Sequence, residues 1–239
     1  MKATAVQKAL QGYATKERAK SNAWFFKTGE GQYGEGDEFI GVTVPQQRLV
    51  AKQFVNLPYT ELKKVLTSKK HEHRLTALLI LVQKYMHAEK KEQKEIVRFY
   101  FSNIEYINNW DLVDLSAPQL VGNHVYVYGG VQKLYSFARS KNLWYRRIAI
   151  VATYSFIRRE RFEPTLLIAK ILLQDKEDLL HKAVGWMLRE VGKRDEKVLK
   201  DFLTEHNSRM PRTMLRYAIE RFPESERKKW LKKDKSLES

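Results

Sequence analysis

The chain has 239 residues, 43% of them hydrophobic, and its 44 Lys and Arg against 28 Asp and Glu give a formal net charge of +16. This hydrophobic content excludes a largely disordered chain, and the length is ample for a sizeable core. The absence of cysteine excludes disulfides, thiolate zinc sites, iron–sulfur clusters and a cysteine nucleophile. We expect no secretion signal and no transmembrane helix, because no apolar stretch is long enough for either.

The basic excess limits the partners. The tail at 224–239 carries six basic and four acidic residues, so a charge of +14 lies on the preceding part of the chain. The expected partner is a polyanion, of which nucleic acid is the commonest large one. The alternative is a basic protein whose charge only keeps it dispersed. We expect no membrane partner, because no helix combines a basic face with a broad apolar one.

The first distinctive segment is a glycine-rich loop over 28–38, within KTGEGQYGEGDEF at 27–39. It contains GEGQYG, a formal match to the dinucleotide-binding pattern. However, no strand precedes it, no helix follows it directly, and Glu30, Glu35 and Asp37 would repel a pyrophosphate. We therefore predict a loop between an N-terminal helix and the rest of the fold.

Beyond this loop, apolar residues mostly recur at helical spacing. The windows that read as amphipathic helices are 74–85, 95–106, 144–157, 166–173, 179–191, 196–203 and 213–222. The VYVY stretch at 125–128 alternates like a strand, but we predict that it opens a helix running on to Arg139. The charged tail at 224–239 is expected to fray, although Trp230 and Leu231 could dock.

Four of these segments share one register. The positions that define it, each 36 residues after the previous one, are Arg74, Trp110, Arg146 and Lys182. Three positions later come small or medium residues, which would let neighbouring helices approach closely: Ala77, Val113, Ala149 and Gly185. Five positions later come residues typical of a core: Leu79, Leu115, Val151 and Met187.

A period near 36 residues is typical of HEAT repeats. We therefore predict an all-α fold, a HEAT-like α-solenoid with a concave basic groove, formed by a single domain over 1–239. A loosely fitting fifth unit around 212–222 would cap it. An irregular helical bundle with accidental spacing is the alternative.

The common catalytic motifs are missing from this chain. It has no Walker loop, no HExxH and no GxSxG. His71 and His73 lie two residues apart, which places them on different faces of a helix, so they do not form a metal site together. We interpret the six histidines as surface or interface residues: His71, His73, His87, His124, His181 and His206.

The most informative segment is NNWDLVDLSAP at 108–118. Asn108 or Asn109 can cap a helix that starts near Trp110. Asp111 then lies in the first turn, where a carboxylate is favoured by the helix dipole. We interpret Asp111 as structural for that reason.

Asp114 differs from Asp111, because it lies beyond the first turn and shares a helix face with Trp110. Pro118 cannot donate to the carbonyl of residue 114, so the helix should bend or end close to this carboxylate. In the repeat register, one stripe gathers two tryptophans, one carboxylate and several cations: Trp110, Asp114, Arg146, Arg147, Lys182 and Trp186. The cations would neutralise phosphates. A lone carboxylate has no part in binding phosphate, so we predict that Asp114 takes part in a reaction.

The chain contains four longer motifs: WDxVD at 110–114 with Pro118, NLWxRRxA at 142–149, KAxGWxLRE at 182–190 and PRTxxRYAIE at 211–220. Together they resemble the AlkD family of DNA alkylation-repair glycosylases, over most of the chain. Members of that family are HEAT-like solenoids that excise cationic N3- and N7-alkylated purines and need no metal. The resemblance implies a glycosylase of base-excision repair that acts on duplex DNA with no metal and no other cofactor.

The resemblance also assigns roles by position. Trp110 and Trp186 are the implied aromatic pair, and Asp114 is the implied catalytic carboxylate. Phe25 falls where an aromatic residue, often tyrosine, contributes to the cleft, so any role of a hydroxyl is lost. The residues that the resemblance and the repeat register place against DNA are Arg147, Arg146, Lys182, Arg189, Thr43 and Phe25.

The chemistry of the lesion agrees with this assignment. Alkylation at N3 or N7 makes the purine a cationic leaving group that needs no general acid, so one carboxylate could suffice where glycoside hydrolases use two. That carboxylate would stabilise the oxocarbenium-like sugar and position water. The alternative is a non-catalytic DNA-binding module that recognises distorted or branched DNA. We expect a monomer in the cytoplasm, associated with the nucleoid when bound to DNA.

Overall fold

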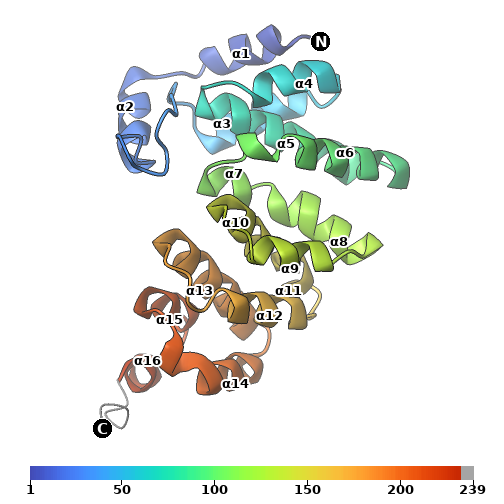
Figure 1. The fold of residues 1–239 in the computed structure, drawn as a ribbon. Coiled ribbons are helices and arrows are strands. Elements are labelled where there is room, and N and C mark those ends of the chain that lie inside the picture. The colour runs from blue at the N-terminus through green and yellow to red at the C-terminus, as the bar shows by residue number, and fades with distance from the viewer. Residues whose placement is uncertain (233–239) are drawn as a thin grey trace. The chain divides into compact units, whose positions relative to one another are not determined.

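The computed structural model describes residues 1–232, and within that range it consists of helices and connecting segments with no β-strand (Figure 1). It divides into two compact units, Met1–His124 (unit 1) and Val125–Ser239 (unit 2), and the division falls within helix α8 (Asn123–Tyr128). The predicted all-α, HEAT-like fold class is confirmed. The single domain and the basic groove stay predictions.

Unit 1 is built around helix α5. In chain order its elements are α1 (Ala3–Gln11), α2 (Lys16–Phe25), α3 (Val44–Gln53), α4 (Tyr59–Leu66), α5 (His71–His87), α6 (Lys90–Ser102), the short 3-10 helix η1 (Ile104–Tyr106), α7 (Trp110–Asp114) and the π-helical turn η2 (Pro118–Gly122). Helix α5 packs against α3, α4, α6 and α7. Every residue at 71–81 is buried, as expected for a helix covered on all sides by its neighbours.

Unit 2 is built in the same way around helix α13. Its elements after α8 are α9 (Gln132–Ala138), α10 (Leu143–Ala152), α11 (Tyr154–Ile157), α12 (Glu163–Ile171), α13 (Asp178–Gly192), α14 (Glu196–His206), the 3-10 helix η3 (Asn207–Arg209), α15 (Arg212–Ala218) and α16 (Glu224–Leu231). Helix α13 packs against α10, α12, α14 and α15. The four positions of the predicted 36-residue register each fall in a helix, namely α5, α7, α10 and α13.

The small residues of that register allow close packing, as predicted. Ala77, Val113 and Ala149 are completely buried. At Gly185, a Cβ atom would lie 2.5 Å from the Met214 carbonyl oxygen. Helix α15 therefore approaches α13 so closely that only glycine fits at this position.

The prediction of one helix from residue 125 to Arg139 is wrong. Helix α8 does include VYVY, but Gly129 and Gly130 adopt φ values of +82° and +93°, in the left-handed region. A right-handed helix cannot continue through two such residues, so α9 starts afresh at Gln132. The predicted windows at 95–106 and 144–157 are likewise interrupted, at Asn103 and Thr153.

The charged tail is more ordered than predicted. Residues 224–231 form helix α16, which begins after Pro223, so the expectation of fraying is wrong for this stretch. Proline before the first turn favours such a start. Lys233 and Lys235 belong to 233–239, outside the described residues. Among residues 1–232, no helix combines the length and the apolar character needed to cross a membrane.

Candidate functional site

Helix α7 carries two of the predicted catalytic residues. Its cap is Asn109, whose side-chain oxygen accepts a hydrogen bond from the Trp110 backbone N–H at 2.8 Å, as the sequence predicts. The helix ends at Asp114, ahead of Pro118, also as predicted. The three central residues of α7 are buried, whereas Trp110 and Asp114 are each partly exposed. At positions i and i+4, the indole and the carboxylate share the outward face of this short helix.

Asp111 has the structural role that the sequence predicts. Its carboxylate is buried, and Oδ1 accepts a hydrogen bond from the Leu112 backbone N–H at 2.9 Å. Its Oδ2 lies 2.8 Å from Nε2 of His71 in helix α5. On the other side of the same ring, Nδ1 of His71 lies 2.9 Å from Oδ2 of Asp37. One buried imidazole therefore joins the loop before α3 to the first turn of α7.

Further polar contacts complete this group, which we call the His71 cluster (Asp37, His71, Arg74, Asn109 and Asp111). Arg74 Nη2 donates to Asp37 Oδ1 at 2.7 Å, and Asn109 Nδ2 donates to Asp37 Oδ2 at 3.2 Å. Burial opposes a charge on His71, but the Asp111 and Asp37 carboxylates outweigh it and raise the pKa of His71 to about 9. Burial also opposes ionisation of Asp37, yet the His71 and Arg74 contacts hold the pKa of Asp37 below its usual value. The cluster is thus a buried set of paired charges near neutral pH.

The interpretation of all six histidines as surface or interface residues is wrong. His71, His73 and His206 are only 1%, 5% and 2% exposed. The first turn of α5, which carries HEH, lies beneath the segment at 37–42, and the sequence does not reveal that cover. Burial and the nearby Lys70 ammonium lower the pKa of His73 to about 4, so this second buried histidine of α5 is neutral.

Aromatic rings of unit 1 surround Trp110. Phe26 stacks on the indole, with ring centroids 5.1 Å apart and planes 9° apart. Phe39 stacks on Phe26 at 5.0 Å and on the His71 ring at 4.6 Å. The predicted Phe25 is 56% exposed and meets the indole edge-on at 6.0 Å. Sequence reasoning missed Phe26, although its position directly after Phe25 was a signal that two aromatic rings lie near this helix.

The segment that carries Phe39 is fixed by Glu72. Both oxygens of this buried carboxylate accept backbone hydrogen bonds, from Ile40 N at 3.0 Å, Gly41 N at 2.8 Å and Val42 N at 3.3 Å. Gly41 has a φ of +81°, and a Cβ there would lie 2.2 Å from the Thr15 carbonyl oxygen. The loop between α2 and α3 is therefore held by the first turn of α5 and packs tightly against α2.

Thr43, a predicted DNA contact, caps helix α3. Its hydroxyl accepts from Gln46 N at 3.4 Å and donates to Gln46 Oε1 at 2.7 Å, while Oε1 also accepts from Thr43 N at 2.9 Å. This reciprocal arrangement is a capping box. The side chain thus has a structural partner in this structure.

The arginines predicted in helix α10 are also engaged within unit 2. Arg146 pairs with Asp175, with Nε to Oδ2 at 2.6 Å, and it donates to two backbone carbonyls. Arg147 is 5% exposed and donates to the Leu179 carbonyl oxygen at 2.5 Å, near the start of α13. Both guanidinium groups therefore tie α10 to the segment that leads into α13.

The predicted cations of helix α13 have acidic neighbours. Lys182 Nζ lies 2.7 Å from Asp178 Oδ2, one turn away, and the hydrogen bond from Lys182 lowers the pKa of Asp178. Arg189 pairs with Glu220 beyond α15. Neither pair is deeply buried, so in each pair the cation can exchange its carboxylate for a phosphate at modest cost.

Trp186, the second predicted aromatic residue, lies on helix α13 and is partly exposed. The Tyr154 ring of α11 lies 6.3 Å from it, tilted by 33°. Gly185, directly before it, lies at the close contact of α13 with α15. Tyr154 was not predicted, and no motif in the sequence distinguishes it from the other tyrosines.

Comparisons with known proteins identify the family and support the helical fold. The family model described as DNA alkylation repair enzyme matches residues 6–222. The chain belongs to that family. The fold is similar to that of a predicted DNA alkylation repair enzyme from Enterococcus faecalis, at 17% identity, with a TM-score of 0.66 over 88% of this chain and 97% of the other. No curated protein matches the chain.

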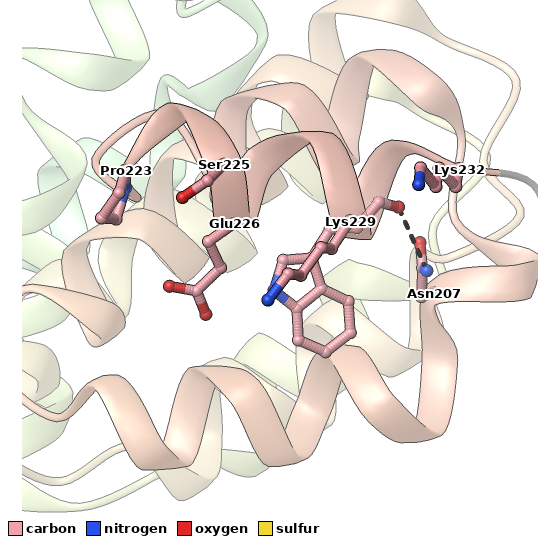
Figure 2. Close-up of a pocket in the computed structure, with 7 residues that line it drawn as sticks. Asn207, Pro223, Ser225, Glu226, Lys229 and Lys232 are labelled. Atoms are coloured by element: carbon pink, nitrogen blue, oxygen red, sulfur yellow. Dashed lines mark hydrogen bonds between the residues drawn. The ribbon is translucent and has the colours of Figure 1, made fainter.

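As a DNA alkylation repair enzyme, the chain acts in the repair of alkylated DNA, and DNA is its partner. Within residues 1–232, no three His, Cys, Asp or Glu side chains come together as a possible metal site. A separate depression of about 630 Å³ lies beside α16 in unit 2 (Figure 2). Its lining contains none of the predicted site residues: Asn207, Pro223, Ser225, Glu226, Lys229, Trp230 and Lys232.

Proposed function

We propose that this DNA alkylation repair enzyme is a glycosylase that hydrolyses the N-glycosidic bond of cationic N3- and N7-alkylpurines in duplex DNA. The observation that carries the proposal is helix α7 in a member of this family. Its three central residues are buried, whereas Trp110 and Asp114, at positions i and i+4, are both partly exposed. A carboxylate beside an aromatic face suits a substrate whose base and sugar both carry positive charge.

The leaving group accounts for the use of one carboxylate. A purine alkylated at N3 or N7 departs as a neutral base, so no side chain has to protonate it. Positive charge then develops on the sugar, and the Asp114 carboxylate stabilises it and holds or deprotonates the attacking water. Asp114 is the catalytic residue of this proposal, and no metal or cofactor takes part in it.

The rings around Trp110 favour a cationic base. An indole face attracts a cation with about 0.5–2 kcal/mol. Phe26 covers one face of the indole in a near-parallel stack, which fixes the plane of the ring. The exposed Phe25 adds a second aromatic side chain next to it, without a hydroxyl.

The residues of unit 2 enter the proposal through DNA binding. Trp186 is proposed as the second aromatic residue of the reaction, and Lys182 and Arg189 as phosphate contacts. Arg146 and Arg147 are proposed as further phosphate contacts that would have to exchange their partners within unit 2. Affinity should then fall with salt by about 0.9 log units per log unit of salt for each phosphate neutralised. We propose that the enzyme acts as a monomer in the cytoplasm, on the DNA of the nucleoid.

The test is base release from methylated duplex DNA. Wild type should liberate 7-methylguanine or 3-methyladenine, and Asp114→Asn should lose about 100-fold or more of that rate while it still binds DNA. Asp201→Asn is the matched control, because Asp201 is an exposed aspartate of α14 paired with Lys197, and its rate should equal that of wild type. Tight, salt-sensitive binding without release by wild type would instead make the protein a non-catalytic DNA-binding module. Equal release by wild type and Asp114→Asn would exclude Asp114 as the catalytic group.

A further inference from the structure

The His71 ring is held between two carboxylates, which restricts its protonation state. Nδ1 and Nε2 lie 2.9 Å and 2.8 Å from the carboxylate oxygens of Asp37 and Asp111. An ionised carboxylate only accepts hydrogen bonds, and a neutral imidazole has one N–H to donate. With both carboxylates ionised, both contacts are hydrogen bonds only when the ring is an imidazolium that donates from both nitrogens.

The charges around this ring balance when it is protonated. Asp37 faces it from the loop before α3, Asp111 from the first turn of α7 and Arg74 from its own helix α5. Phe26 and Phe39 cover it with neutral rings, 4.9 Å and 4.6 Å away. Loss of the proton would therefore leave two buried carboxylates with one cation, which is an unfavourable arrangement in a buried site.

Two routes lead from His71 to Trp110. The first runs through Asp111, the residue after Trp110, whose carboxylate binds both the imidazolium and the backbone at the start of α7. The second runs through the Phe26 ring, which lies against both His71 and the indole. Helix α7 has only five residues, so its direction depends on such end contacts more than on its own hydrogen bonds.

We infer that His71 is a positioning residue for the reaction: as an imidazolium it fixes the start of α7 through Asp111 and the Phe26 ring, and so sets the placement of the Trp110 indole and of Asp114. It touches no substrate in this role. The inference rests on the proposed function for its consequence on catalysis, but the placement of Trp110 can be tested without any reaction.

The first experiment follows Trp110 by fluorine NMR in protein labelled with fluorotryptophan. Trp110→Phe identifies the resonance by its loss. In wild type, this resonance should shift as pH rises, with a midpoint near the His71 pKa of about 9. In Asp111→Asn the midpoint should move to lower pH, because the carboxylate that most favours the imidazolium is gone.

The matched pair of variants is His71→Gln and His73→Gln. His73 is a buried histidine of the same helix turn, and its Nδ1 contacts Ser68 Oγ at 3.0 Å. The alkaline shift of the Trp110 resonance should vanish in His71→Gln and persist in His73→Gln. Circular dichroism shows whether each variant is folded, and the wild-type titration tests the inference even if His71→Gln is not.

The second experiment measures the rate of base release across the same pH range. The wild-type rate should fall above the same midpoint, and His71→Gln should be slower by up to about 100-fold near neutral pH without that alkaline fall. A Trp110 resonance that does not titrate in wild type, or that titrates unchanged in folded His71→Gln, would overturn the inference. If wild type releases no base but its Trp110 resonance still follows His71, the proposed function fails while the placement by His71 stands.

Discussion

The carboxylate of Glu72 gives the sharpest test of how the loop beside the candidate site is held. It is 1% exposed and accepts three hydrogen bonds from consecutive backbone N–H groups, those of Ile40, Gly41 and Val42. Glu72→Gln keeps the size of the side chain but replaces one acceptor oxygen with an NH₂ donor. If the remaining oxygen stays with Gly41 and Val42, the new NH₂ group faces the N–H of Ile40.

The expected change in the free energy of unfolding follows from these contacts. An N–H group left without an acceptor costs about 1–3 kcal/mol, and each of the two remaining hydrogen bonds loses about 1 kcal/mol when its acceptor becomes neutral. A neutral amide is less costly to bury than a carboxylate, which offsets part of this loss. We expect Glu72→Gln to lower the free energy of unfolding by about 3 kcal/mol, a large share of the 5–15 kcal/mol typical of a domain.

The assay is denaturant unfolding followed by circular dichroism, with hydrogen exchange of the three amides as a local readout. Glu17→Gln is the control, because Glu17 is an exposed glutamate in helix α2, and it should change the unfolding free energy by less than about 0.5 kcal/mol. The amides of residues 40–42 should exchange faster in Glu72→Gln at native conditions. Equal stability and equal exchange in the two variants would show that Glu72 does not hold this loop.

Three more outcomes are expected. Gly185→Ala should destabilise the protein by about 1–3 kcal/mol in thermal or denaturant unfolding, because its Cβ would lie 2.5 Å from the Met214 carbonyl oxygen; an unchanged stability would refute the close contact of α13 with α15. Folding raises the pKa of His71 from 6.5 to about 9, so its protonation contributes about 3 kcal/mol to the free energy of unfolding. This contribution is complete below pH 6.5 and should disappear as pH rises through about 9. Unfolding curves across that pH range would measure it. Phe26→Leu should weaken binding of alkylated DNA through loss of the stack on Trp110, while the circular dichroism spectrum stays unchanged. Equal affinity of the variant and wild type for alkylated DNA would argue that the stack has no part in binding.

Local patterns made much of the fold predictable. The 36-residue register located α5, α7, α10 and α13, and its small residues predicted the tight contact at Gly185. The Asn109 cap and the structural role of Asp111 followed from rules that act within one helical turn. Gly129 and Gly130 carried a breaking signal that the apolar spacing of their neighbours outweighed in our interpretation.

Contacts between distant residues account for what the sequence did not reveal. The His71 ring meets Asp111 across 40 positions and Asp37 across 34, so neither spacing shows in a local pattern. The acidic partners of Arg146 and Arg189 lie about 30 residues further along the chain, at Asp175 and Glu220. Charge counting therefore identified basic residues as candidates but did not show which of them the fold would pair with carboxylates.

The order of folding events follows from the way Glu72 recognises its loop. One carboxylate binds three consecutive backbone groups that lie 30 to 32 positions earlier in the chain. It can do so only after the first turn of α5 exists, since an unformed turn offers no fixed acceptor and closing a loop of this length costs entropy that a local helix does not. The loop, the Phe39 ring and the stack on Trp110 should therefore form late, so native contacts at residues 37–42 should contribute little to the transition state for folding.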